Sequence, residues 1–331
     1  MDWFQRLTGF SEQSPEQVKQ HLTLENDRLC STVNNQCWSV GRLNMPSLAE
    51  LRATATALPG RLQVSEVIGD VQKLHADPAN AGALFQVASQ FNLLEMVSPR
   101  VTPEQGVGMY GRDFTQGPAC AIAAGTAAIY RNYFADVNGQ QGQSSSQQLD
   151  CIADLGAALG NTNNALWQMQ NGYVMASEQG LAQIQRHLSS ISHEQREQFK
   201  GLLRIGVHTD TDVTLEGCNH QVTQVFCSAL PLAYSMHDDE LWAEFAQLIL
   251  EAAYEATLAV AVQNAQATGN NRVYLTLLGG GAFGNPDEWI IDAIRKALLA
   301  YQDSGLQVGI VSHAQSKAQV RALLGEINNV S

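Results

Sequence analysis

The residues best suited to chemistry form a glycine-rich loop near the C-terminus, at positions 278–286. Its consecutive glycines lack a Cβ, so the backbone can turn sharply and approach a ligand closely. Asn285 and Pro286 suit the N-cap and first position of a following helix, whose free N–H groups attract phosphate without any basic side chain. We therefore predict a diphosphate-binding site formed by Gly279, Gly280, Gly281, Ala282, Phe283, Gly284 and Asn285.

Two other structures are compatible with this pattern. The spacing Gly279-x-Gly281-x-x-Gly284 also satisfies the dinucleotide fingerprint of Rossmann domains. In that fold the motif follows the first strand, whereas here only one further strand is predicted, and it ends at His313 without an acid for the ribose. A tight turn beneath a packed helix, with no ligand, is the structural alternative.

The sequence lacks the motifs of two other enzyme classes. No Gly-x-Ser-x-Gly elbow occurs and no Walker lysine follows the glycines, which argues against serine hydrolases and P-loop NTPases. The segments His208-x-Asp210-x-Asp212 and Cys218-x-His220 carry metal-capable side chains, but neither spacing completes a recognised site. We therefore predict no metal and no cofactor.

The elements around the loop indicate an α/β protein. A strand at 272–278, a helix at 286–301 and a strand at 306–312 predict a βαβ unit, preceded by a long helix at 239–267. Shorter apolar runs alternate with helical ones from residue 62 onward, and residues 151–188 look helical. Helix starts at Ser14 and Ser47 predict a helical N-terminal extension over 1–60, ahead of a main domain at 61–331.

Composition limits the partners. The formal net charge is −13, from 32 acidic and 19 basic residues, so nucleic acid is not expected as a partner. No signal-peptide h-region or apolar run of membrane-spanning character stands out, and we expect a cytoplasmic protein without a membrane partner. The 6 cysteines form no CxxC pair, which predicts reduced, packed thiols and no disulfide framework. The oligomeric state is left open.

The order long helix, strand, Gly-Gly-Gly-Ala-Phe-Gly-Asn-Pro, helix, strand resembles the C-terminal half of macrodomains, the ADP-ribose-binding fold that includes poly(ADP-ribose) glycohydrolases. Upstream, Gly69-Asp70-Val71 resembles the family's Gly-Asp-Ile turn, and Val-Ala-Ser-Gln-Phe-Asn at 87–92 resembles its strand ending in a ribose-binding Asn. The resemblance implies a three-layer α/β/α macrodomain-like mixed sheet, with ADP-ribose as the ligand. It also implies that the glycine loop holds the diphosphate and that Phe283 and Asn92 contact the distal ribose.

The resemblance is incomplete in two places. An adenine-binding Asp is expected just before the strand that ends at Asn92, but Phe85 and Gln86 stand there. The family's glycine-rich segment after that Asn is replaced by an irregular loop at 97–117. A loop of that length without its own periodicity is more often functional than idle.

The segments Asn-Leu-Leu-Glu, Tyr-Gly-Arg-Asp-Phe-Thr-Gln-Gly-Pro and Leu-Leu-Gly-Gly-Gly-Ala-Phe-Gly-Asn resemble a divergent macrodomain group. That group includes a bacterial effector that removes ADP-ribose from an arginine of ubiquitin, and its members hydrolyse with loop carboxylates. The reaction needs proton delivery to the leaving guanidine and activation of a water. The resemblance thus implies Asp113, Glu104 and Glu95 as catalytic candidates, with Asp113 first.

Each candidate also has a structural alternative. Asp113 could cap the helix that follows it, Glu104 could be a solvated turn residue, and Glu95 could pair with Arg100 or Arg112. Gln116 could bind a ribose hydroxyl or cap the same helix. We predict an ADP-ribosyl hydrolase that removes ADP-ribose from an arginine of a modified protein, with ubiquitin as one candidate substrate. The alternatives are a non-catalytic ADP-ribose reader and a structural protein on the same fold.

Overall fold

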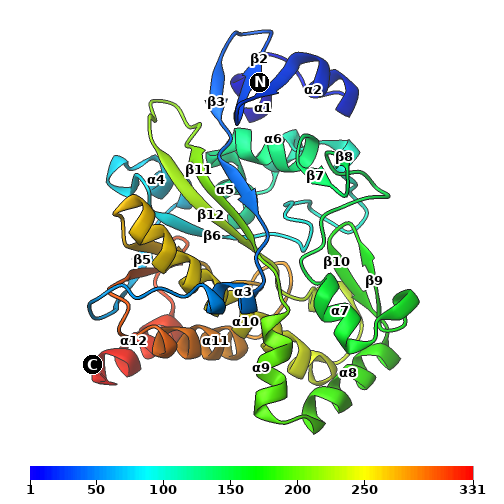
Figure 1. Cartoon of the computed structure of the whole chain (residues 1–331), viewed down its shortest axis with the longest axis vertical. Coiled ribbons are helices and arrows are strands. Elements are labelled where there is room, and N and C mark those ends of the chain that lie inside the picture. The colour runs from blue at the N-terminus through cyan, green and yellow to red at the C-terminus, as the bar shows by residue number, and fades with distance from the viewer. Residues whose placement is uncertain (331) are drawn as a thin grey trace.

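The computed structural model describes residues 1–330 and contains a seven-stranded mixed sheet (Figure 1). The strand order is β4-β11-β12-β6-β13-β14-β5. Strands β12 to β5 run parallel in that order, whereas β11 is antiparallel to both of its neighbours. The strands are β4 (Arg42–Asn44), β5 (Gln63–Ile68), β6 (Leu84–Ala88), β11 (Gly206–Asp212), β12 (Gln221–Cys227), β13 (Arg272–Leu275) and β14 (Gln307–Ser312).

Helices cover both faces of this sheet. One layer is built around α10 (Asp239–Thr268), which contacts β6, β12 and β13 and the other helices of its layer. These are α3 (Leu48–Ala53), α8 (Glu178–Ser190), α9 (His193–Gly201) and α11 (Asp287–Ala300), and α12 (Ala318–Val330) packs on α11. The other layer holds α4 (Val71–Ala76), α5 (Gln116–Ala123) and α6 (Gly125–Tyr133). The predicted three-layer α/β/α arrangement is confirmed.

The long apolar segment at 239–268 forms helix α10, which lies in the core of the protein. Within residues 1–330 it is the one helix long and apolar enough to cross a membrane. However, 89% of its most apolar window is buried inside the protein, as in the core helix of a layered fold. Its side chains pack against the sheet on one side and against α8 and α11 on the other.

The first sixty residues contain helices, as predicted, and also strands. Helix α1 (Trp3–Thr8) is followed by α2 (Pro15–His21), where the Ser14 hydroxyl accepts from the Gln17 N–H at 3.2 Å. Ser47 and Glu50 form the predicted capping box of α3. The strands β1 (Leu22–Glu25), β2 (Arg28–Ser31) and β3 (Cys37–Ser39) form a small antiparallel sheet, and β4 joins the main sheet.

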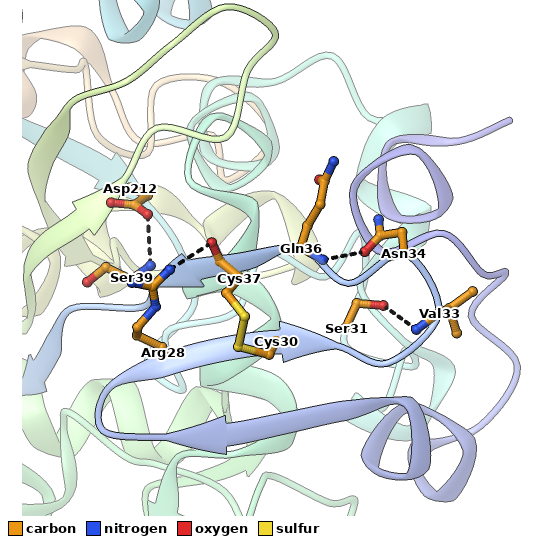
Figure 2. Close-up of a disulfide and its surroundings, with 9 residues drawn as sticks. All are labelled: Arg28, Cys30, Ser31, Val33, Asn34, Gln36, Cys37, Ser39 and Asp212. Atoms are coloured by element: carbon orange, nitrogen blue, oxygen red, sulfur yellow. Dashed lines mark hydrogen bonds between the residues drawn. A yellow bond between two sulfur atoms is a disulfide. The ribbon is translucent and has the colours of Figure 1, made fainter.

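A disulfide joins β2 and β3, which corrects the prediction that all cysteines are reduced. Cys30 and Cys37 face each other across the antiparallel pair, and their sulfurs are bonded (Figure 2). No local motif predicts this disulfide, because the two cysteines become neighbours only when the hairpin forms. Beside them, the Asp212 carboxylate accepts from the Ser39 N–H at 2.8 Å and ties the hairpin to β11. The remaining thiols are Cys120, Cys151, Cys218 and Cys227.

The disulfide predicts a measurable loss of stability on its removal. Replacing Cys30 and Cys37 together with Ser should lower the free energy of unfolding by about 2 kcal/mol, because an unlinked short loop gains entropy when unfolded. Chemical denaturation without reductant would measure this difference. Thiol titration of the denatured, unreduced wild type should find the 4 free cysteines. Finding all 6 would show that the disulfide does not form.

The region at 151–188 is not wholly helical. Between α7 (Ala153–Leu159) and α8 lies a hairpin of β9 (Trp167–Gln170) and β10 (Tyr173–Ala176). Its turn residues Asn171 and Gly172 both have positive φ, at 47° and 81°. An Asn-Gly pair is the sequence typical of a two-residue hairpin turn, so a local signal for this hairpin was present.

Candidate ligand-binding and active site

The parallel strands place their carboxyl ends at one edge of the sheet, and two adjoining cavities lie there. This is where open α/β sheets bind ligands, because loops and helix starts converge beyond the strand ends. The large cavity has a volume of about 970 Å³ and the small cavity about 150 Å³. Both are bordered by two loops, which contribute the shared wall residues Asp113, Thr115, Gln116, Thr276, Leu277 and Gly281. We call the two cavities together the cleft.

The glycine-rich loop at 278–286 forms one wall of the cleft. It follows β13 and folds back on itself, since the Asn285 N–H donates to the Gly279 carbonyl at 3.0 Å and the Gly284 N–H to Gly281 at 3.1 Å. Gly279 and Gly284 have φ of 80° and 73°, a region that side chains disfavour. A Cβ at Gly279 would lie 2.5 Å from the Ala229 Cβ. Glycine is therefore required at these two turns.

Three consecutive backbone N–H groups in this loop are free. Within the described part of the chain, the N–H groups of Gly281, Ala282 and Phe283 donate to no acceptor. Gly281 borders both cavities, and a Cβ placed on it would meet no atom within 4 Å. Successive free N–H groups beside open space form an anion-binding concavity.

Asn285 is not the N-cap of the following helix, contrary to the prediction. Helix α11 begins at Asp287 and its N-cap is Pro286, so Asn285 does not cap it. Instead the Asn285 side-chain amide donates to the Leu230 carbonyl at 2.8 Å, in the segment after β12. The side chain is buried. Asn285 therefore anchors the glycine loop to the segment that follows β12.

Phe283 belongs to an aromatic wall of the small cavity. Its ring centroid lies 5.3 Å from that of Tyr173 and 5.8 Å from that of Tyr234. All three residues border the small cavity. The Tyr173 hydroxyl donates to the Met96 carbonyl at 2.6 Å, which fixes the β9–β10 hairpin against the cleft. Tyr173 was not among the predicted site residues because the hairpin that carries it was not predicted.

Asp113 borders both cavities. One carboxylate oxygen, Oδ1, accepts from the Thr115 N–H at 2.9 Å and from the Thr115 hydroxyl at 2.7 Å. The other oxygen, Oδ2, has no hydrogen-bond partner among residues 1–330. Thr115, not Asp113, is the N-cap of α5. The local turn therefore orients Asp113 and leaves one oxygen free at the cleft.

Glu95 borders the small cavity and is almost completely buried, with its side chain 1% exposed. It pairs with Arg131 of α6 at 3.2 Å, not with Arg100 or Arg112 as considered from the sequence. Oxygen Oε2 of Glu95 has no hydrogen-bond partner in the described structure. Burial raises the pKa of Glu95 to about 7, while the Arg131 charge opposes the shift. Glu95 therefore exchanges a proton more easily at neutral pH than an ordinary carboxyl group.

Glu104 lies apart from these two carboxylates. Its Oε1 accepts from the Ser145 N–H at 2.7 Å and from the Ser145 hydroxyl at 2.9 Å, so it holds the segment at 144–148. It borders neither cavity. The structure thus brings two of the three candidate carboxylates to the cleft and gives the third a structural role.

Asn92 and Gln116 both use their carboxamides inside the protein. Asn92 is buried and borders neither cavity, since it donates to Gln148 at 2.9 Å and accepts from the Leu94 N–H at 3.1 Å. Gln116 borders the cleft, but it accepts from the Ala88 N–H at 2.9 Å and donates to the Gln86 carbonyl at 2.8 Å. Asn92 stabilises the loop after β6, and Gln116 ties the start of α5 to that strand.

Charged residues that were not among the predicted site residues border the large cavity. Arg112 and Lys317 come from opposite parts of the chain, and within residues 1–330 neither charged group has an ion-pair or hydrogen-bond partner. Asp70 caps α4 by accepting from the Gln72 N–H at 2.8 Å and is exposed to the cavity. Arg112 and Lys317 carry no local signal, because only folding brings them to one cavity, whereas Asp70 lies in the segment that resembles the Gly-Asp-Ile turn.

The metal-capable residues noted in the sequence are separated by their contacts. Asp210 pairs with Arg42 at 3.0 Å and Asp212 accepts from Ser39, while His208 is buried. Among the residues that the structure describes, no group of three or more His, Cys, Asp or Glu side chains is placed to hold a metal ion.

Comparison with known proteins gives structural neighbours alone. No family model and no curated protein matches the sequence. A poly(ADP-ribose) glycohydrolase from Thermomonospora curvata is 13% identical with a TM-score of 0.45, over 95% of this chain and 97% of that chain. The same enzyme from Deinococcus radiodurans in complex with ADP-ribose is 10% identical with a TM-score of 0.45, over 87% and 92%. The T. curvata enzyme bound to the inhibitor ADP-HPD is 14% identical with a TM-score of 0.44, over 94% and 97%.

Proposed function

We propose that the chain binds an ADP-ribosyl group in the cleft and hydrolyses its bond to a modified protein. The observation that carries this proposal is the juxtaposition of an anion-binding backbone with two carboxylates. The residues with free N–H groups, Gly281, Ala282 and Phe283, border the small cavity, and Gly281 also borders the large one. Asp113 and Glu95 border the small cavity as well. A diphosphate on the glycine loop would place a sugar beside those carboxylates.

The charge around the large cavity supports an anionic ligand. The whole chain carries a net charge of −13, yet Arg112 and Lys317 stand at this cavity without ion-pair partners within residues 1–330. Unpaired cations gain most by facing a phosphate. We propose that they flank the diphosphate and that the Asp70 carboxylate accepts from the amino group of the nucleobase. Asp70 would then supply the adenine contact that is missing at Phe85 and Gln86.

The two carboxylates differ in environment, and that difference suggests their roles. Glu95, with a pKa raised to about 7 by burial, can hold a proton for the leaving group. Asp113 has one free oxygen at the cleft and can accept a proton from water. In the proposed step, Glu95 protonates the leaving atom as its bond to ribose C1 breaks, and water adds to C1 as Asp113 takes its proton. The products are free ADP-ribose and the unmodified side chain.

The proposed substrate is an ADP-ribosylated arginine, including that of ubiquitin. This part of the proposal rests on the resemblance of the segments at 92–95, 110–118 and 277–285 to a divergent macrodomain group, which includes an effector that removes ADP-ribose from an arginine of ubiquitin. The guanidine leaves as a neutral base when it carries the extra proton as its bond to ribose C1 breaks, and an acid such as Glu95 can deliver that proton to the unprotonated form. Hydrolysis assays on proteins modified at arginine, with serine-modified and glutamate-modified proteins as comparisons, test the choice of bond.

Turnover should depend on pH through Glu95. Because an acid acts in its protonated form, we expect kcat to fall as the pH rises through about 7. The fall should approach about tenfold per pH unit above that value. Glu95→Gln should lower kcat at pH 6 and remove this alkaline limb. A variant that keeps the same limb would show that another group titrates.

Calorimetric titration with ADP-ribose is the primary test, with AMP and NAD as comparison ligands. Micromolar affinity for ADP-ribose together with release of ADP-ribose from a modified protein would support a hydrolase. Binding without turnover would support a reader, which is the second candidate because Glu95 already pairs with Arg131 and Asp113 already binds Thr115. Absence of binding to all three nucleotides would overturn both.

A further inference from the structure

A carboxylate from the N-terminal segment reaches into the loop that carries Asp113. Glu12 Oε1 accepts from the Val107 N–H at 3.0 Å, and Oε2 accepts from the Gly108 N–H at 2.6 Å. The Tyr133 hydroxyl at the end of α6 donates to Oε1 at 2.7 Å. Three donors from two distant segments therefore converge on one side chain.

The loop is built to admit this carboxylate. A Cβ at Gly106 would lie 2.4 Å from Glu12 Oε2, and one at Gly108 would lie 2.8 Å from the same atom. Real Cβ atoms do not approach so closely, so both glycines are matched to the presence of Glu12. Burial raises the pKa of Glu12 and its three hydrogen bonds lower it, so the contacts compensate for a carboxylate placed away from water.

The contact lies at the start of a short helix that ends at Asp113. The 3-10 helix η3 (Gly108–Arg112) has Val107 as its N-cap, and Val107 provides no side-chain cap. Glu12 supplies the missing acceptor from a different part of the chain. Asp113 is the C-cap of η3 and its N–H donates to the Tyr110 carbonyl at 3.1 Å. The Glu12 contact and Asp113 therefore stand at the two ends of one five-residue helix.

We propose that Glu12 is a positioning residue that caps η3 and thereby holds Asp113 at the cleft. The N-terminal segment is then part of the site architecture, a role that its sequence did not indicate. The catalytic part of this inference rests on the function proposed above, whereas the capping of η3 does not. Trp3 and Glu12 themselves border the large cavity, so the segment also forms part of its wall.

Hydrogen exchange on Glu12→Gln in the full chain tests the capping directly. Glutamine has the same shape but lacks the charge, and its NH₂ group would face an N–H or O–H donor at a position where a carboxylate oxygen accepts in the wild type. We expect exchange at Val107 and Gly108 to accelerate roughly tenfold or more, because bonds to a charged acceptor are the stronger ones. Exchange at Thr115, whose N–H reports on Asp113, should accelerate as well. Exchange in α10 should not change.

Two further variants keep the test decisive. Glu50→Gln is the matched control, because Glu50 also accepts from a backbone N–H, in the capping box of α3, far from η3. Its exchange at 107–115 should equal that of the wild type. Gly108→Ala should disrupt the same contact, because its Cβ would lie 2.8 Å from Glu12 Oε2. It should therefore accelerate exchange at the same residues as Glu12→Gln.

The outcomes separate this inference from the proposed function. If kcat falls more than KM rises in Glu12→Gln, positioning of Asp113 is supported. Unchanged exchange at Val107 and Gly108 would overturn the cap, and accelerated exchange there with Thr115 unchanged would overturn the link to Asp113. An inactive wild type would refute hydrolysis, but the exchange pattern would still decide whether Glu12 holds the loop.

Discussion

Gly281→Glu is expected to abolish ADP-ribose binding while the protein stays folded. The new side chain starts in open space, since a Cβ at Gly281 meets no atom within 4 Å. Its carboxylate would occupy the position proposed for the diphosphate and repel it. At about 4 Å and an effective dielectric of about 20, the repulsion is about 4 kcal/mol per charge pair, so affinity should fall roughly 100-fold or more. Calorimetric titration measures the loss.

Gly281→Ala is the control for this variant. It adds the Cβ without the charge and should bind ADP-ribose nearly as the wild type does. Thermal unfolding of both variants should match the wild type, because the position packs against nothing. Wild-type affinity in Gly281→Glu would show that the diphosphate lies elsewhere. Equal loss in both variants would indicate a general disturbance of the loop.

Asp113→Asn is expected to lower kcat about 1,000-fold and to leave ADP-ribose affinity nearly unchanged. Asparagine keeps the Oδ1 acceptor, so the turn to the Thr115 N–H should persist. What it removes is the proton acceptor proposed to activate water. Single-turnover release of ADP-ribose, measured beside equilibrium binding, separates the loss of chemistry from a loss of affinity.

Asp77→Asn provides a matched control for Asp113→Asn. Asp77 makes the same kind of turn, accepting from the Ala79 N–H at 2.9 Å, but it lies outside both cavities. Its replacement should leave kcat unchanged. A small effect of Asp113→Asn, combined with a large effect of Glu95→Gln, would instead assign the main catalytic role to Glu95.

Local sequence was sufficient for the central part of the fold. The helix at 239–268, the unit β13-α11-β14 and the helix starts at Ser14 and Ser47 all follow from periodicity and capping residues within a few positions of one another. The hairpin at 167–176 was not predicted, although Asn171-Gly172 indicates its turn. The helical pattern on both sides of it favoured a helix over the whole of 151–188.

The candidate site was only partly predictable. The glycine loop could be found because its backbone conformation depends on its own residues. The carboxylates could be identified as candidates, but their roles in the fold depend on residues that are distant in the sequence. Glu95 forms an ion pair with Arg131, and Glu104 accepts a hydrogen bond from the Ser145 N–H. Asn92 was assigned to the ligand by resemblance, yet its amide is bound by Gln148 and the Leu94 N–H.

The sequence by itself determined the α/β layering and the conformation-permitting glycines of the loop at 278–286, because these depend on hydrophobic period and on local backbone freedom. The tertiary structure alone decided that Glu12 caps η3, that Arg112 and Lys317 share one cavity, and that Cys30 bonds to Cys37. The physical reason is that the residues of each pair are separated in the sequence, by a large part of the chain or by the turn of a hairpin. Hydrogen bonds, ion pairs and desolvation act between neighbours in space, and only the folded backbone makes these residues neighbours.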